Sequence, residues 1–125
     1  MSYQEFLSFQ KEGAVGIVRL NRPEQLNTIS APFYEAMIAL QETEIVNNKD
    51  LRAIALLADG RHFSAGIDLN YAKTVIGMPG RSLYGVSHWQ RAYRFWQECN
   101  LPVAVGIQGA CMGTAMELVA ACDFR

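Results

Sequence analysis

The sequence predicts a mixed α/β fold in which short strands alternate with helices. Two short apolar runs, 15–20 and 53–58, flank a segment from Ser30 to about Val46 whose apolar residues recur at helical spacing. A third apolar run, 103–107, is followed by a glycine-containing loop and another helical pattern. Strands and helices that alternate in this way are typical of β-α-β units.

The composition indicates one modest globular unit. The chain has 125 residues, of which 50% are apolar, and a net charge of −1. This length predicts a single domain or less. The eleven basic and twelve acidic residues are interleaved without a run of like charge, so we expect no nucleic-acid partner and no membrane partner.

The targeting and cysteine patterns favour the cytoplasm. Cys99, Cys111 and Cys122 form no CxxC pair and are odd in number, which favours reduced thiols. Residues 1–11 lack both the apolar stretch of a signal peptide and the basic amphipathic character of a transit peptide. No apolar stretch approaches the roughly 20 residues that span a bilayer. We therefore expect a cytoplasmic protein.

The first half is expected to form a hairpin, a helix and a buried strand. Residues 15–20 are predicted to be a strand that pairs with 6–9. Ser30 can cap the helix that follows, and Pro32 fits its first turn. Residues 53–58 are an apolar run bracketed by charge, which predicts a strand buried on both faces.

The second half is expected to contain two further helices and a strand. Residues 74–85 include three glycines and one proline, which predicts irregular structure. A helix should follow, and its apolar stripe consists of Val86, Trp89, Tyr93 and Trp96. Residues 103–107 predict another buried strand, and 114–121 a short helix. Residues 122–125 resemble the start of a further strand, so we expect a partial chain.

The segment 61–69 carries the first candidate for chemistry. Its small residues lie between a buried strand and an expected helix, and Gly66 would let backbone amides approach a ligand closely. Such amides can hydrogen-bond an oxyanion. The alternative is a tight turn in which Asp68 caps the helix. The local sequence leaves both interpretations open.

The segment 106–123 carries the second candidate. Gly113 and its small neighbours lie where a helix would begin and present free amides. Glu117 is the sole charged residue between Leu101 and Asp123. In apolar surroundings its carboxyl group would hold a proton more tightly, which suits a general acid/base. The alternative is a glutamate on the exposed face of a short helix.

Three segments in this order resemble those of the enoyl-CoA hydratase/isomerase (crotonase) superfamily. They are 21–27 (NRPEQLN), 63–69 (FSAGIDL) and 102–125, which contains GACMG and ACDFR. The resemblance covers essentially the whole chain, which is similar to the N-terminal half of a family member. It implies that residues 1–125 are the N-terminal part of a single crotonase-like domain, a spiral of ββα units, whose remainder is absent. Half a spiral exposes surface, so we expect the 125 residues alone to be marginally stable.

The resemblance also implies a substrate, an assembly and a site. The substrate would be an acyl-CoA thioester, with no cofactor beyond its CoA moiety, and the complete protein would form a homotrimer or hexamer. The backbone amides of Ile67 and Thr114 correspond to the oxyanion hole that stabilises the enolate. Glu117 corresponds to the first of two catalytic glutamates in hydratases, and the second lies beyond Arg125. The residues expected to contact CoA are Leu26, Ser64, Ala65, Gly66, Ile67, Asp68, Leu69 and Gly113.

Two departures leave the reaction open. The family commonly has three glycines where this chain has Gly113-Thr114-Ala115, and the branched side chain of Thr114 narrows the pocket or restricts the turn. The loops also resemble the dienoyl-CoA isomerase branch, which has an aspartate in place of Glu117. We expect hydration of a 2-enoyl-CoA. The alternatives are isomerisation of an enoyl-CoA or dienoyl-CoA double bond, and a non-catalytic assembly or acyl-CoA-binding role.

Other classes of site are disfavoured. His62 and His88 have no cysteine or carboxylate at metal-ligand spacing, so we expect no metal. Ser64 does not lie in a G-x-S-x-G motif, which disfavours nucleophilic catalysis. Neither loop matches the G-x-G-x-x-G or lysine-containing phosphate-binding patterns.

Overall fold

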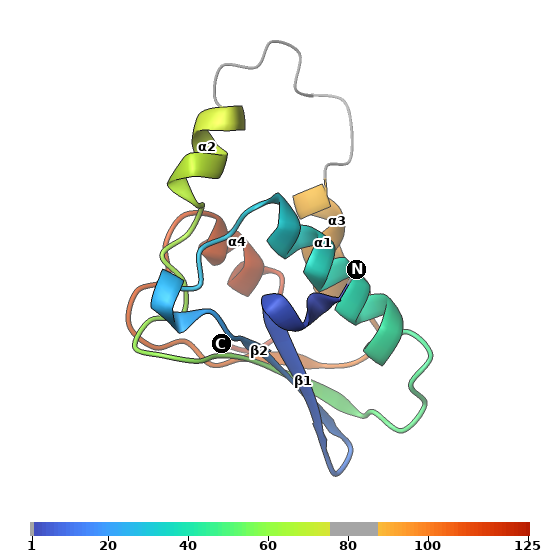
Figure 1. Cartoon of the computed structure of the whole chain (residues 1–125). Coiled ribbons are helices and arrows are strands. Elements are labelled where there is room, and N and C mark those ends of the chain that lie inside the picture. Colours follow the sequence, from blue (N-terminus) through green and yellow to red (C-terminus); the bar gives the residue numbers. More distant parts are fainter. Residues whose placement is uncertain (1, 76–87) are drawn as a thin grey trace.

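The computed structural model describes residues 2–75 and 88–125, which form a four-stranded sheet with helices over one face (Figure 1). The strands are β1 Leu7–Glu12, β2 Val15–Leu20, β3 Ala53–Ala58 and β4 Val103–Val105. The helices are α1 Ala31–Leu40, α2 Leu69–Val75, α3 His88–Glu98 and α4 Thr114–Ala120, with the short turns η1 Tyr3–Glu5, η2 Pro23–Gln25 and η3 Gln41–Ile45. The α/β prediction is confirmed.

The strand order is β1-β2-β3-β4, and it combines a hairpin with two parallel pairings. β1 and β2 are antiparallel, with Leu7 opposite Leu20, whereas β2–β3 and β3–β4 are parallel. The predicted bounds 15–20 and 53–58 match β2 and β3. The predicted hairpin arm was too short, because β1 continues to Glu12 and keeps its pairing up to the turn.

Helix α1 confirms the predicted helix and continues into the π-helical turn η3. Its apolar stripe, Phe33, Met37 and Leu40, is buried. Pro32 lies in the first turn as predicted. Ser30 occupies the cap position, but its side chain makes no capping hydrogen bond, so that expectation is wrong. Its extended backbone instead accepts a hydrogen bond at the carbonyl oxygen from the Tyr34 amide, at 3.2 Å.

The prediction that β3 is buried on both faces is wrong for one face. Ile54, Leu56 and Ala58 are buried beneath the helices, while the alternate residues of β3 are only half-buried. In the described residues, the helices lie over one side of the sheet. β4 likewise exposes Ala104. It ends two residues earlier than predicted, because the chain then leaves the sheet and Gln108 accepts a hydrogen bond from the Phe63 amide at 2.7 Å.

The remaining helices pack unequally. Asp68 Oδ1 accepts a hydrogen bond from the Tyr71 amide at 2.9 Å, so Asp68 caps α2. α2 contains the first two residues of the segment predicted to be irregular, and residues 76–87, including Val86, lie outside the described chain. On α3, Tyr93 and Trp96 are buried in the core, whereas Trp89 is 38% exposed.

The described residues contain no helix with the length and apolar character needed to cross a bilayer.

A buried tyrosine links the N-terminus to the end of the first helical segment. Tyr3 lies in η1 and its hydroxyl donates to Glu44 Oε1 in η3 at 2.6 Å. Burial, together with the hydrogen bond and the negative charge of Glu44, raises the pKa of Tyr3 to about 12. The protonated phenol is therefore favoured by folding.

We predict a specific loss of stability at alkaline pH. Because the folded pKa of Tyr3 exceeds the unfolded value of about 10, its contribution is full below about pH 10 and is lost as the pH rises through about 12. Urea unfolding of the natural protein and its Tyr3→Phe variant should show a difference that shrinks from pH ~8 to pH ~11.5. A difference that stays constant with pH would contradict this role.

Candidate active site

The two small-residue loops lie side by side. The first loop, 61–68, follows β3, and the second loop, 106–113, follows β4. The Ser64 amide donates to Ala110 O at 3.1 Å, and the Met112 amide donates to Ser64 O at 3.1 Å. Ser64 and Cys111 thereby form a parallel bridge. Because β3 and β4 are parallel neighbours, their following loops leave the same edge of the sheet and extend this pairing beyond it.

A third segment pairs with the other side of the first loop. The Ala65 amide donates to Leu26 O at 3.0 Å, and the Ile29 amide donates to Gly66 O at 2.9 Å. The Asp68 amide donates to Ile29 O at 2.7 Å, and Ile29 and Ile67 form a parallel bridge. Segments around residues 26, 65 and 111 are therefore joined into one ribbon, although they are widely separated in the sequence.

Gly66 is required where the two loops touch. Its φ of +91° lies in a region that side chains disfavour, and a Cβ added there would lie 2.6 Å from Met112 O. The same Cβ would lie 3.8 Å from Gly113 N. The backbone that precedes Ile67 is thus in contact with the backbone that precedes Thr114.

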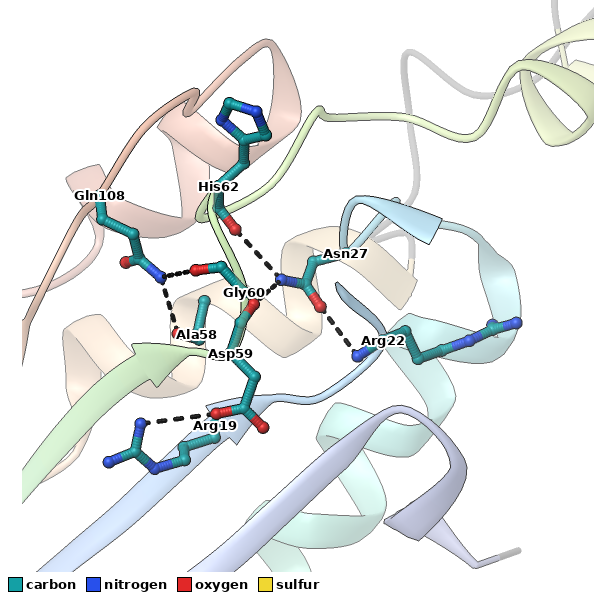
Figure 2. A network of polar contacts seen from close by, with 8 residues as sticks. All are labelled: Arg19, Arg22, Asn27, Ala58, Asp59, Gly60, His62 and Gln108. Atoms are coloured by element: carbon teal, nitrogen blue, oxygen red, sulfur yellow. Dashed lines mark hydrogen bonds and ion pairs between the residues drawn. The ribbon is translucent and has the colours of Figure 1, made fainter. Parts of the chain in front are cut away.

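Figure 2 shows that the Asn27 side chain holds the first loop against the turn that follows β2. Asn27 is 3% exposed and has a φ of +50°. Its Oδ1 accepts a hydrogen bond from the Arg22 amide at 2.9 Å. Its Nδ2 donates to Asp59 O at 2.9 Å and to His62 O at 3.3 Å. One buried amide therefore joins two turns and the first loop.

Gln108 makes the corresponding connection from the second loop (Figure 2). Its Nε2 donates to Ala58 O at 2.7 Å and to Gly60 O at 3.1 Å. The carbonyl groups at and after the end of β3 thus accept hydrogen bonds from two side chains, those of Asn27 and Gln108. The ion pair between Arg19 and Asp59, at 3.6 Å, lies at the same strand ends and is exposed.

Two further side chains support the loops, and sequence reasoning missed these roles. The Ser64 hydroxyl is buried, donates to Asn27 O at 2.7 Å and accepts from the Gly66 amide at 3.1 Å. Nδ1 of His62 accepts from the Ala110 amide at 2.9 Å, so this histidine is a half-buried structural residue. The hydrogen-bond partners of both side chains are backbone groups, which leave no pattern in the sequence. The one available signal was that Ser64, like Asn27, lies within a segment that resembles the family.

The amides of Ile67 and Thr114 have no hydrogen-bond partner among residues 2–75 and 88–125. Ile67 directly follows Gly66, and Thr114 is the first residue of α4. Ile67 is 38% exposed, so a ligand can reach this segment. Unpaired amides on two touching loops can donate hydrogen bonds to an oxygen that carries negative charge.

Glu117 lies one turn beyond Thr114 and is exposed. The expectation of apolar surroundings for its carboxyl group is therefore wrong in this chain. Ala115, Leu118 and Val119 turn into the core, whereas Glu117 and Met116 occupy the opposite side of α4. Leu118 and Val119 follow Glu117 in the sequence, but in the helix they point to the other side.

The Thr114 hydroxyl joins two buried tyrosines. Thr114 Oγ1 lies 3.2 Å from the Tyr34 hydroxyl and 3.0 Å from the Tyr93 hydroxyl. Burial raises the pKa of both tyrosines, and the negative charge of Glu117 is a smaller cause in the same direction. Both phenols therefore stay protonated at neutral pH. The tyrosines had not been singled out as a pair from the sequence.

A cleft of about 420 Å³ lies beside the first loop. Its lining residues are Gln25, Leu26, Thr28, Ala65, Ile67, Asp68, Leu69 and Asn70. Of the residues expected to contact CoA, five line this cleft, while Ser64, Gly66 and Gly113 do not. The described residues contain no group of three or more His, Cys, Asp or Glu side chains that could hold a metal ion.

The model of the family "Enoyl-CoA hydratase/isomerase" matches residues 10–125. The chain belongs to this family. The match and the structural likeness below confirm the predicted relationship to the N-terminal portion of crotonase-type proteins, and the crotonase fold of the matched part.

Individual relatives span two reaction types. The mitochondrial Delta(3,5)-Delta(2,4)-dienoyl-CoA isomerase of Rattus norvegicus is 30% identical over 117 residues, which cover 86% of this chain and 36% of the relative. The short-chain-enoyl-CoA hydratase of Clostridium acetobutylicum is 29% identical over 117 residues, which cover 93% of this chain and 44% of the relative. The crystal structure of an enoyl-CoA hydratase from Shewanella pealeana superposes with a TM-score of 0.86 and 27% identity, over 94% of this chain and 44% of that one. The chain thus spans less than half the length of these relatives.

We predict that Gly66→Ala destabilises the protein more than a glycine substitution at an open site. The new Cβ would be strained by φ and would press on a backbone oxygen, so we expect a loss of about 3–4 kcal/mol in urea unfolding. Gly13→Ala is the matched control, because Gly13 has a φ of +59° and nothing within 4 Å. It should cost about 1–2 kcal/mol. Equal losses would show that the loop contact imposes no constraint.

Removal of the Asn27 side chain should also destabilise the protein. Asn27→Ala leaves the Arg22 amide and two carbonyl groups without their partner, and we expect a loss of about 2–4 kcal/mol in the free energy of unfolding. Asn48→Ala is the control, since Asn48 also bonds to the backbone but is only half-buried. Its cost should be below about 1 kcal/mol. A smaller loss for Asn27→Ala than for Asn48→Ala would contradict this assignment.

Proposed function

We propose that the complete protein acts on acyl-CoA thioesters through an enolate, and that its reaction is hydration of a 2-enoyl-CoA. The observation that carries the proposal is the pair of unpaired amides, Ile67 and Thr114, on two loops held in contact at Gly66. Family membership supplies the class of substrate. Residues 1–125 would form the N-terminal part of a single crotonase-like domain.

The two amides would bind the thioester oxygen. When water adds at C3 of the enoyl group, electron density moves through C2 and the carbonyl carbon to this oxygen, which becomes an enolate. Fixed donors aimed at the developing charge stabilise the transition state by about 3 kcal/mol each. Protonation at C2 then gives the 3-hydroxyacyl product.

Glu117 would act on the attacking water. Residues three apart in a helix share a face, so Glu117 and Thr114 lie on the same side of α4. The exposed carboxylate would act on a ligand bound at the amides. By family resemblance, a second carboxylate beyond Arg125 would share this task, so that the pair positions water and transfers its protons.

The cleft beside the first loop would hold part of the CoA moiety. Leu26, Ala65 and Ile67 supply apolar surface and backbone groups there. The reaction as proposed requires no cofactor beyond CoA and no metal. Homotrimeric or hexameric assembly of the complete protein is part of the proposal. So is a cytoplasmic location, although the rat relative is named as a mitochondrial protein.

Double-bond isomerisation is the second candidate. The rat dienoyl-CoA isomerase, at 30% identity, is the observation that favours it. The same oxyanion site would stabilise a dienolate, and a carboxyl group would move a proton between carbons instead of activating water. Glu117, rather than an aspartate, favours hydration.

The test is hydration of crotonyl-CoA by the natural protein, followed by the loss of enoyl absorbance. Removing a general acid/base costs about a hundred- to ten-thousand-fold, so Glu117→Gln should lower kcat by that amount with KM little changed. Glu12→Gln, in the exposed end of the hairpin, is the charge-matched control and should retain parent activity.

The alternative outcomes are distinct. A parent that isomerises a 3,5-dienoyl-CoA but does not hydrate crotonyl-CoA would establish the second candidate. A parent that binds acyl-CoA without converting either substrate would indicate a binding role. A Glu117→Gln variant as active as the parent would remove this residue from the mechanism.

A further inference from the structure

Three helices meet at a single hydroxyl oxygen beside the candidate site. Tyr34 lies on α1, Tyr93 on α3 and Thr114 at the start of α4. Thr114 Oγ1 is within hydrogen-bond distance of both tyrosine hydroxyls, at 3.2 and 3.0 Å. The two tyrosine rings contact each other edge to face, with centroids 5.7 Å apart. Both tyrosines are 4% exposed, so water cannot readily replace Thr114 as their partner.

The tyrosines are themselves held rigidly by the core. α1 and α3 pack against each other, and the Trp96 indole nitrogen donates to Met37 Sδ at 3.3 Å across their interface. Gln41 Nε2, at the start of η3, donates to Ala92 O on α3 at 2.8 Å. The Thr114 hydroxyl oxygen is therefore hydrogen-bonded to side chains that are fixed in the core, and not to side chains on the surface.

Fixing this oxygen also fixes the backbone next to it. Threonine is branched at Cβ and has few χ1 rotamers, and two hydrogen bonds to Oγ1 select one of them. Since χ1 is the dihedral angle N–Cα–Cβ–Oγ1, a fixed Oγ1 in one rotamer restrains the position of the Thr114 backbone nitrogen. A glycine here, as is common in the family, would have no atom for the tyrosines to hold.

We propose that Tyr34 and Tyr93 are positioning residues, which act through Thr114 Oγ1 to hold the Thr114 amide in the direction of the thioester oxygen. This inference rests on the function proposed above and assigns the tyrosines no contact with substrate. With glycine at this position, the turn alone would set the direction of the amide. Here the hydrogen bonds of the Thr114 hydroxyl also set it.

The alternative role for the tyrosines is proton transfer. Burial raises the pKa of Tyr34 and of Tyr93, so neither phenol loses its proton at neutral pH. Both are hydrogen-bonded to Thr114, the first residue of α4. Neutral, mutually bonded hydroxyls are suited to fixing geometry.

The experiment uses acetoacetyl-CoA, a thioester whose bound enolate absorbs in the ultraviolet, and the natural protein. Enolate absorbance at saturation reports oxyanion stabilisation, and calorimetry of the same complex reports total binding. The variants are Thr114→Val, which replaces the hydroxyl by a methyl group, and Tyr93→Phe and Tyr34→Phe. Thr114→Ser is the conservative variant that keeps the hydroxyl.

We expect Thr114→Val and Tyr93→Phe to lower the bound-enolate fraction and kcat about ten- to a hundred-fold, with KM changed less than about two-fold. Thr114→Ser keeps the hydroxyl, so it should lose less of the bound-enolate fraction and of kcat than Thr114→Val. Tyr3→Phe is the structural control, because it removes another buried tyrosine hydrogen bond, to Glu44 in η3. It should lower stability without changing the enolate spectrum.

A double variant separates positioning from general destabilisation. If the tyrosine acts through Thr114, Tyr93→Phe added to Thr114→Val should cause no further loss of enolate, whereas independent effects would multiply. Multiplying effects, or parent-like spectra in both single variants, would overturn the inference while leaving the proposed function intact. A parent that binds acetoacetyl-CoA without forming an enolate would overturn the proposed function and this inference together.

Discussion

The contact between Gly66 and the Met112 carbonyl is the constraint on which the candidate site depends. A side chain at residue 66 would meet that oxygen at 2.6 Å, so the two loops can touch only as bare backbone. The touching loops in turn extend the pairing of β3 and β4 beyond the sheet, through the bridge between Ser64 and Cys111. The unpaired amides are those of Ile67, which directly follows Gly66, and of Thr114, which lies two residues after Met112, so their separation is set by backbone and not by mobile side chains.

Buried polar groups around the loops keep this backbone arrangement from relaxing. Asn27, Ser64 and His62 each bond to main-chain groups of another segment. A buried donor or acceptor that loses its partner is costly, so such groups tie the loops to one geometry. The exposed face is left to Ile67 and to the cleft beside it.

Local patterns in the sequence predicted much of the fold but little of the support. Residues 15–20 and 53–58 are short apolar runs between turn residues, and their strands have those bounds. An apolar run does not reveal how many faces are covered, which is why β3 was expected to be buried on both. Glu117 has apolar neighbours along the chain, so the sequence left both a buried and an exposed carboxyl group open, and the structure has it exposed. The bonds of Asn27 and Tyr93 to residues far away in the sequence, 35 positions to His62 and 21 to Thr114, carry no local signal.

The parallel pairing of β3 with β4 also bears on how the chain is made. Ile54 pairs with Val103, so β3 leaves the ribosome well before its second neighbour exists. At about 5–20 residues per second, one edge of this strand stays unpaired for a few seconds of synthesis. Parallel pairings of this separation also form slowly after synthesis, because a long chain segment must be closed first. An unpaired apolar edge is a template for pairing with another chain, so the nascent protein is most exposed to misassembly in the interval before residue 103 emerges.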